Sequence, residues 1–122
     1  MCPRVWVAGV FAGVAFLLPA SSALAANTIT VNTTNDAAAT PAECSGAAND
    51  CSLRQAIDKA AAGDTIAVPA NANPYAVTLG EIAFSTDNLT IQGAGARQTT
   101  VQGNGNSRIF NVGGTTEKIA GV

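Results

Sequence analysis

The sequence contains no histidine, and this absence removes the commonest acid–base side chain near neutral pH and the imidazole ligands of most zinc sites. It also excludes Ser–His–Asp and Cys–His nucleophilic systems. Charged side chains make up only 11% of the 122 residues, and 8 acidic against 6 basic side chains give a net charge of −2. Binding to nucleic acid requires a basic surface. We therefore predict no nucleic-acid partner.

Aromatic residues are also few, at 5%, although 48% of the residues are hydrophobic. Much of that hydrophobic content lies at the start, where Arg4 precedes an uncharged run over 5–18 and small residues stand at Ala23 and Ala25. This pattern predicts a signal peptide over 1–25 that is cleaved after Ala25. The alternative is an uncleaved anchor helix, but the run is shorter than the roughly 20 residues of a membrane span. We expect a secreted or cell-surface protein with no membrane contact after cleavage.

Cysteines are scarce as well, since only Cys44 and Cys51 follow the predicted cleavage point. In an exported protein such a pair predicts a disulfide, which would restrict the unfolded chain by roughly 2 to 3 kcal/mol. A redox or metal pair is the alternative, but the spacing fits neither Cys-x-x-Cys nor a zinc site. Asp36 and Asp50, each after an asparagine, offer too few oxygens for calcium. We predict no cofactor and no metal.

One helix is indicated, over residues 52–62. Ser52 can cap it, and Gln55 three residues later completes a capping box. Leu53 and Ile57 fall on one apolar face, and Gly63 is the expected C-terminal cap. A helix of this length is unstable alone, so we expect Leu53 and Ile57 to pack on an apolar surface.

Short apolar runs broken by turn residues predict the strands, beginning with the alternating run 28–33. Val68 and Ile91, Leu79 and Val101, and Phe84 and Phe110 lie about 22 to 26 residues apart, which is the period of a parallel β-helix. An antiparallel sandwich also fits this spacing and stays open. The Gly-x-Gly pairs at 93–95 and 103–105 suit corners and lack the helix that a phosphate loop opens. The further predicted strands are 64–68, 76–79, 81–84, 88–92, 99–102 and 108–112.

The segment Cys51-Ser52-Leu53-Arg54-Gln55-Ala56-Ile57 resembles the signature of the family named for its Cys-Ser-Leu-Arg-Glu-Ala (CSLREA) motif. That family's segment forms the N-terminal part of exported bacterial proteins with right-handed parallel β-helix repeats. Gln55 stands where the family usually has glutamate, and a capping box accepts either. The resemblance continues through 28–34, 63–66, 89–95, 99–101 and 107–110.

The resemblance implies an all-β fold in which residues 26–63 form an N-terminal cap and residues 64–122 form about two laps of a right-handed β-helix. The strand and helix of the cap would cover the open end of the first lap, as a solenoid requires. We expect Arg54 to bond to strand or loop carbonyls, with a solvated arginine as the alternative. The chain stops where a third lap should begin, so we expect a truncated solenoid whose open edge self-associates.

We therefore expect an exported structural or surface module, acting in adhesion or in contact with surface polysaccharide or a host or cell-surface protein. The alternative is the N-terminal fragment of a β-helix polysaccharide lyase or glycosidase. Such an enzyme needs paired carboxylates, or acidic calcium ligands with a basic residue. The candidates would be Glu81, Asp87, Arg97 and Arg108, and since no two acids recur at one position of the repeat, we assign no catalytic residue.

Overall fold

The computed structural model describes Gly13 and residues 25–122, so the predicted signal peptide over 1–25 lies almost entirely outside the described residues. The described part is mostly β, with a single short helix, as predicted. No helix in it is both long and apolar enough to span a bilayer. The elements are β1 (Thr28–Thr30), α1 (Leu53–Lys59), β2 (Thr65–Val68), β3 (Tyr75–Val77), β4 (Ile82–Phe84), β5 (Thr90–Gly93), β6 (Val101–Gly103), β7 (Phe110–Val112) and β8 (Lys118–Ala120).

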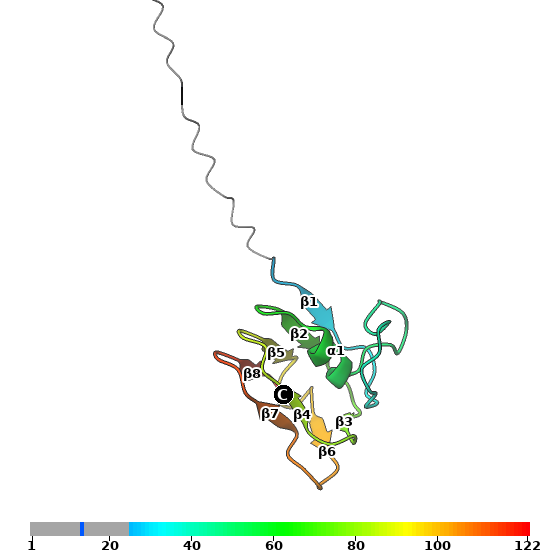
Figure 1. The fold of residues 1–122 in the computed structure, drawn as a ribbon. Helices are drawn as coiled ribbons and strands as arrows, with labels where there is room; N and C mark the ends of the chain where they lie inside the picture. The colour runs from blue at the N-terminus through cyan, green and yellow to red at the C-terminus, as the bar shows by residue number, and fades with distance from the viewer. Residues whose placement is uncertain (1–12, 14–24) are drawn as a thin grey trace, which may run out of the picture.

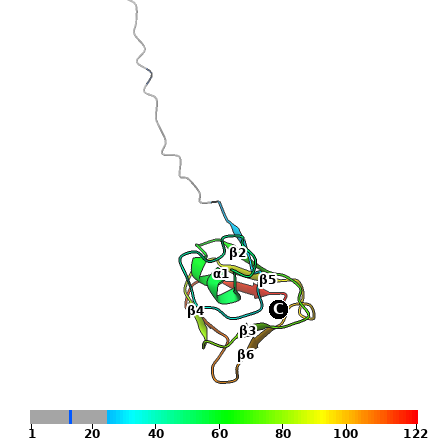
Figure 2. The same cartoon turned by 90° about the vertical axis from the view of Figure 1, so that its right-hand side faces the viewer.

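Every strand pair in the described residues is parallel, which excludes the antiparallel sandwich. One sheet has the order β1-β2-β5-β8, and two smaller sheets are made of β3-β6 and β4-β7. The chain thus visits the three sheets in turn through β2, β3 and β4, and again through β5, β6 and β7 (Figure 1). Figure 2 shows the sheets on three sides of a common interior, with α1 lying over it.

Isoleucine forms a column through the four-stranded sheet. Ile29 pairs with Ile66, Ile66 with Ile91, and Ile91 with Ile119. Ile66 and Ile91 are fully buried, whereas Ile119 at the far edge is 40% exposed. Since side chains of a strand alternate between the two faces, the neighbours of these isoleucines point outward. On this side the interior is therefore lined by a stack of β-branched residues, each contributed by a different strand.

The predicted strand pairs are correct, but their register is not. The sequence spacing suggested that Val68 matches Ile91 and Leu79 matches Val101, whereas Val68 lies opposite Gly93 and Val101 lies opposite Tyr75. Phe110 pairs with Ile82 rather than with Phe84. A shift by an even number of residues keeps the same side chains facing inward. The apolar pattern alone therefore cannot distinguish these registers.

The last strand, β8, was not predicted. It lies beside β5, and the chain after it passes so close to that strand that a Cβ atom on Gly93 would overlap the carbonyl of Gly121. The Gly95 amide donates to the same carbonyl over 2.9 Å. Gly93 is thus required by a close approach of two backbones, and Gly95, with φ +145°, supplies the corner beside it.

The helix is shorter than predicted, and the predicted cap at Gly63 is wrong. The C-cap is Ala60, whose ψ of 140° takes the chain out of the helix. The Asp64 carboxylate accepts from the Ala61 amide at 2.9 Å and from the Asn27 amide at 2.9 Å, so it holds a tight turn that leads directly into β2. Gly63 has φ +84° within that turn. Its positive φ therefore serves the turn and not the helix end.

Candidate functional site

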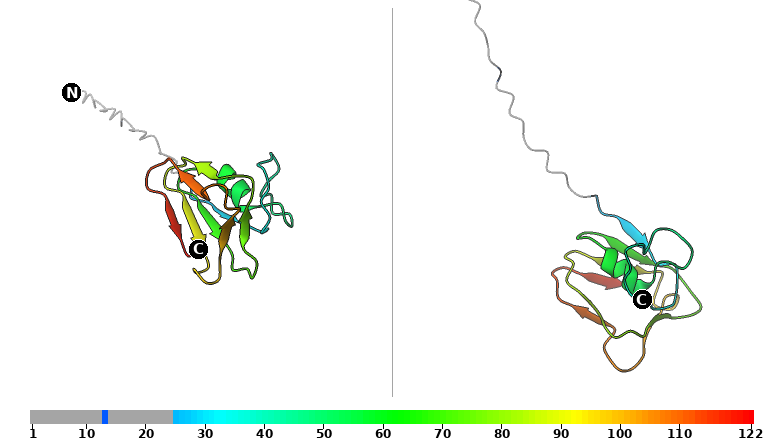
Figure 3. Two further views of the ribbon diagram at one scale, coloured as in Figure 1. Left: turned by 90° about the horizontal axis from the view of Figure 1, so that it is seen from below. Right: turned by 45° about the vertical axis from the view of Figure 1, so that its right-hand side comes forward.

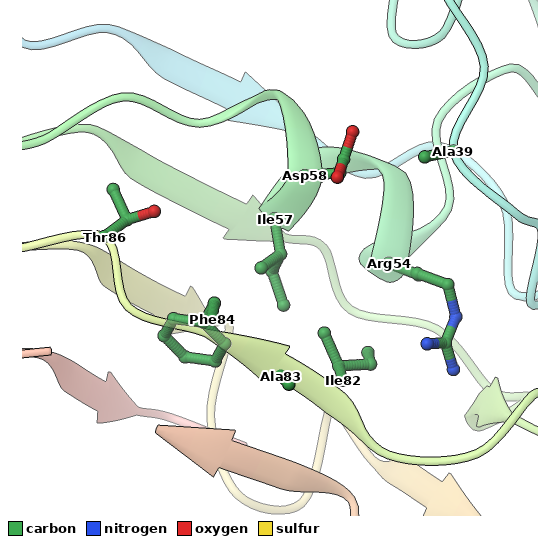
Figure 4. Close-up of a pocket in the computed structure, with 8 residues that line it drawn as sticks. All are labelled: Ala39, Arg54, Ile57, Asp58, Ile82, Ala83, Phe84 and Thr86. Carbon is green, nitrogen blue, oxygen red and sulfur yellow. The ribbon is translucent and has the colours of Figure 1, made fainter. Parts of the chain in front are cut away.

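The apolar face of α1 closes one end of the interior. Leu53, Ala56 and Ile57 are buried, and Ile57 points toward Ile82 and Phe84 of β4 (Figure 4). A pocket of about 310 Å³ lies between the helix and β4. Because a helix of this length gains its stability from the surface it covers, the fold and the helix depend on each other at this contact.

A capping box fixes the start of α1. The Ser52 Oγ accepts from the Gln55 amide at 3.2 Å, and the Gln55 Oε1 accepts from the Ser52 amide at 2.9 Å. The Gln55 Nε2 also donates to the Ala38 carbonyl over 3.0 Å, and the Ser52 Oγ donates to the Ala37 carbonyl over 3.3 Å. A glutamate at position 55 could close the box but could not donate to Ala38. Gln55 therefore joins the helix start to the preceding loop.

Arg54 and Asp36 form a clasp between the helix, that loop and the turn before β4. The Arg54 Nε and Nη2 donate to the two carboxylate oxygens of Asp36 over 2.8 and 3.0 Å. Arg54 also donates to the carbonyls of Gly80 and Glu81. The expected bonding of Arg54 to loop carbonyls is thus confirmed, but the carboxylate partner was missed. Nothing in the sequence pattern joined Asp36 to a helix that begins far along the chain.

The Asp36 carboxylate is almost fully covered, with its side chain 1% exposed. Burial raises the pKa of this carboxyl, but the bonds from Arg54 and from the Leu79 and Thr78 amides outweigh burial, so its pKa lies below the ordinary value of 3.8. The two amides donate over 2.8 and 2.7 Å. Four donors around one carboxylate make this residue a structural anchor that is ionised at neutral pH.

The loop over residues 31–52 projects beside α1 (Figure 3), and the predicted disulfide between Cys44 and Cys51 closes the last part of it, residues 44–51. The Asp50 carboxylate accepts from the Ser45 hydroxyl at 2.6 Å and from the Ser45 amide at 2.8 Å. These hydrogen bonds, the hydroxyl first, lower the pKa of Asp50. Lys59, in the last turn of α1, donates to the Glu43 carbonyl over 2.9 Å. The loop over residues 31–52 is thereby bonded to both ends of the helix, through residues 36–38 at its start and Glu43 at its last turn.

Of the four residues considered for catalysis, Glu81 and Arg108 are in direct contact, whereas Asp87 bonds elsewhere. Glu81 precedes β4 and pairs with Arg108 over 2.7 Å, and its other oxygen accepts from Asn111. Asp87 follows β4 and accepts from the Thr115 amide and hydroxyl, and these two bonds lower its pKa. Arg97 is exposed on a turn. Each acid thus links its turn to the segment 28 or 30 residues later in the chain.

Two buried polar residues that sequence reasoning missed hold the corners of the fold. Asp64 lies in the turn before β2, and Thr99 precedes β6 with no exposed surface. The Thr99 hydroxyl donates to the Val68 carbonyl over 3.2 Å and accepts from the Ala94 amide at 2.9 Å. Thr99 lies in the segment 99–102 that was predicted as a strand, where threonine is an ordinary residue. No sequence signal marks it as a corner.

Within residues 25–122 and Gly13, no group of three or more Cys, Asp or Glu side chains could hold a metal ion. The features concentrated around α1 are the buried apolar face, the capping box, the Arg54–Asp36 clasp and the disulfide loop. All of these features connect α1 with other segments of the chain. Comparison of the chain with models of known families, with curated proteins and with solved structures found no match in any of the three.

Proposed function

We propose that this chain is an exported structural module, in which residues 26–63 cap one end of a right-handed parallel β-helix and residues 64–122 form its first laps. The closure of the interior by α1 is the observation that carries this proposal. At that end Leu53, Ala56 and Ile57 are buried, whereas at the other end Val112 and Ile119 are 42% and 40% exposed. A solenoid needs a cover of this kind over a terminal lap, because that lap cannot bury its inner face alone.

The resemblance to the CSLREA family gives further support, because each motif position has a separate role at the cap. Cys51 is in the disulfide, Ser52 and Gln55 form the capping box, and Arg54 binds Asp36. The remaining positions 53, 56 and 57 are buried against the interior. A short motif in which every side chain makes a specific contact is what a cap requires, since it must join a helix and a loop to a sheet.

For the partner, we propose surface polysaccharide or a protein of the cell surface, bound on the outer face of the sheets. One polar column on that face favours such contact, because Thr28, Thr65 and Thr90 lie in register along the four-stranded sheet. The alternative, a fragment of a polysaccharide lyase or glycosidase, is less favoured because Glu81 and Asp87 each bind a neighbouring segment. Depolymerisation of pectin-like or alginate-like polymers by the purified chain would favour the enzyme.

The cap is tested by placing charge beneath the helix. In the chain beginning at residue 26, Leu53→Asp and Ile57→Asp each put an unpaired carboxylate into the interior, and we expect unfolding or aggregation. The matched control is Asp58→Ala, on the exposed side of the same helix, which we expect to change the unfolding free energy by less than about 0.5 kcal/mol. Cooperative melting of Leu53→Asp and Ile57→Asp at the native temperature would mean that α1 is not a cap.

A further inference from the structure

We propose that Asn104 is a site of spontaneous deamidation, and that the reaction breaks a contact between two laps of the fold. Asn104 is the only asparagine in the sequence that is followed by glycine. It lies with Gly105 and Asn106 in the exposed loop between β6 and β7. Because glycine has no side chain, its amide nitrogen can approach the preceding asparagine without hindrance. The other asparagines are followed by residues that carry a Cβ atom.

In the first step, the Gly105 nitrogen attacks the Cγ of Asn104. A bond forms between these two atoms, the Cγ–Nδ2 bond breaks, and ammonia leaves with the proton of the Gly105 amide, which gives a cyclic succinimide. Water then opens the ring at either carbonyl and yields aspartate or isoaspartate. The reaction needs only water, and electrons and atoms balance without an oxidant.

The local geometry supports attack at this residue. The Asn106 amide donates to the Asn104 Oδ1 over 3.2 Å, and this is the oxygen on which negative charge develops when Cγ is attacked. A donor at that position stabilises the charge, as in an oxyanion hole. Gly105 has φ +80°, so the attacking residue already has a conformation in which glycine is favoured.

The consequence follows from the second hydrogen bond of the same side chain. The Asn104 Nδ2 donates to the Thr78 carbonyl over 3.1 Å, and the register that pairs Val77 with Gly103 places these two residues side by side. Either product has a carboxylate where the amide was, and a carboxylate cannot donate. An oxygen would then face the Thr78 carbonyl. Isoaspartate would also lengthen the backbone of the loop.

The first experiment is incubation of the chain beginning at residue 26 in mildly alkaline buffer, followed by digestion and mass spectrometry. We expect a mass increase of about 1 Da at Asn104 before any other asparagine, with part of the product as isoaspartate. Asn106 is the internal comparison, because it lies in the same loop and precedes serine. An unmodified Asn104, or earlier modification of Asn106 or another asparagine, would overturn the assignment.

The second experiment measures how much the Tm falls when Asn104 is replaced by aspartate, in the variant Asn104→Asp, because aspartate is one of the two products of deamidation. Loss of one hydrogen bond of ordinary strength lowers the Tm of a domain of this size by roughly 4 to 8 °C. Asn106→Asp is the matched control, because it adds the same charge two residues away, and we expect a much smaller shift. Equal melting of Asn104→Asp and Asn106→Asp would mean that the bond to Thr78 does not hold the laps together.

Discussion

Removal of Arg54 is expected to destabilise the chain more than removal of any other cation in its described part. Its side chain is 17% exposed, and that of its partner Asp36 is 1% exposed. Truncating one partner of a buried ion pair typically costs about 3 to 5 kcal/mol, because the other charge stays buried. In Arg54→Ala the carboxylate keeps its two amide donors from Thr78 and Leu79. We therefore expect Arg54→Ala to lower the unfolding free energy by about 3 kcal/mol, at the lower end of that range.

The assay is urea denaturation followed by circular dichroism, with the free energy of unfolding obtained by linear extrapolation. Arg97→Ala is the matched control, because Arg97 is exposed on a turn, and we expect it to change that free energy by less than about 0.5 kcal/mol. Should Arg54→Ala leave too little folded protein, Arg54→Lys keeps the charge but loses the two-pronged geometry. We expect it to fall between the native chain and Arg54→Ala.

A double-mutant cycle shows whether the two residues act through each other. Arg54→Ala combined with Asp36→Ala leaves no unpaired charge. The double variant should therefore lose less unfolding free energy than the two single variants lose in sum, by roughly 1 to 3 kcal/mol. If Arg54→Ala behaves like Arg97→Ala, or if the two substitutions are additive, the clasp contributes nothing and the reasoning from its burial is wrong.

The Asp36 carboxylate also makes the unfolding free energy of the chain depend on pH. The pKa of Asp36 in the folded chain lies below its ordinary value of 3.8. As the pH falls, this carboxyl therefore takes up a proton in the unfolded chain before it does so in the folded chain. The stability that Asp36 contributes is therefore fully present above 3.8 and is lost as the pH falls through 3.8 toward the lower folded pKa. We expect the difference in unfolding free energy between the native chain and Asp36→Asn to shrink over that window. A constant difference would contradict the assigned shift.

Three further predictions concern the disulfide and the corners. Thiol titration of the exported, denatured and unreduced protein should find no free thiol, because Cys44 is joined to Cys51, and two free thiols per chain would refute the bond. Thr99→Val removes the hydroxyl partner of the buried Val68 carbonyl and of the partly buried Ala94 amide, and it should lower the unfolding free energy by about 1 to 3 kcal/mol in urea denaturation. Thr100→Val, on the exposed neighbour, should lower it far less. Gly93→Ala should lower the Tm because its methyl group meets the Gly121 carbonyl, and an unchanged Tm would place that approach in doubt.

Strand positions were predictable because the chain repeats short runs of inward-facing apolar residues between turn residues. Each predicted segment after residue 63 contains or overlaps an observed strand, since β-branched residues between turn residues leave little choice. The register was not predictable, because shifts of two residues bury the same face. β8 was missed because Ile119 is its only large apolar residue. Its identity as a strand comes from pairing with β5, which no local pattern displays.

The partners in the polar contacts around α1 were predictable only where a known short-range motif joins them. Ser52 and Gln55 were recognised because a capping box has a fixed spacing. Asp36, which contacts Arg54, and Asp64, which contacts Asn27, were missed because each bond joins distant parts of the chain. The helix end was misplaced for a different reason, because the Ala61 amide donates to the nearby Asp64 carboxylate and this local turn uses the glycine that suggested a helix cap.

The contacts around α1 differ in kind from those between the strands. Within the sheets, neighbouring strands are joined by backbone hydrogen bonds, so their side chains need only provide an apolar, buried face. Many different sequences meet that requirement. The helix α1 and the loop before it have no such repeated ladder, so specific side chains position them, among them Arg54 on Asp36 and Gln55 on Ala38. Specific contacts are accordingly concentrated over 51–57, where each side chain is buried, bridged or bonded to another segment. The strands share only their spacing and an inward apolar residue, such as the isoleucine column of the four-stranded sheet.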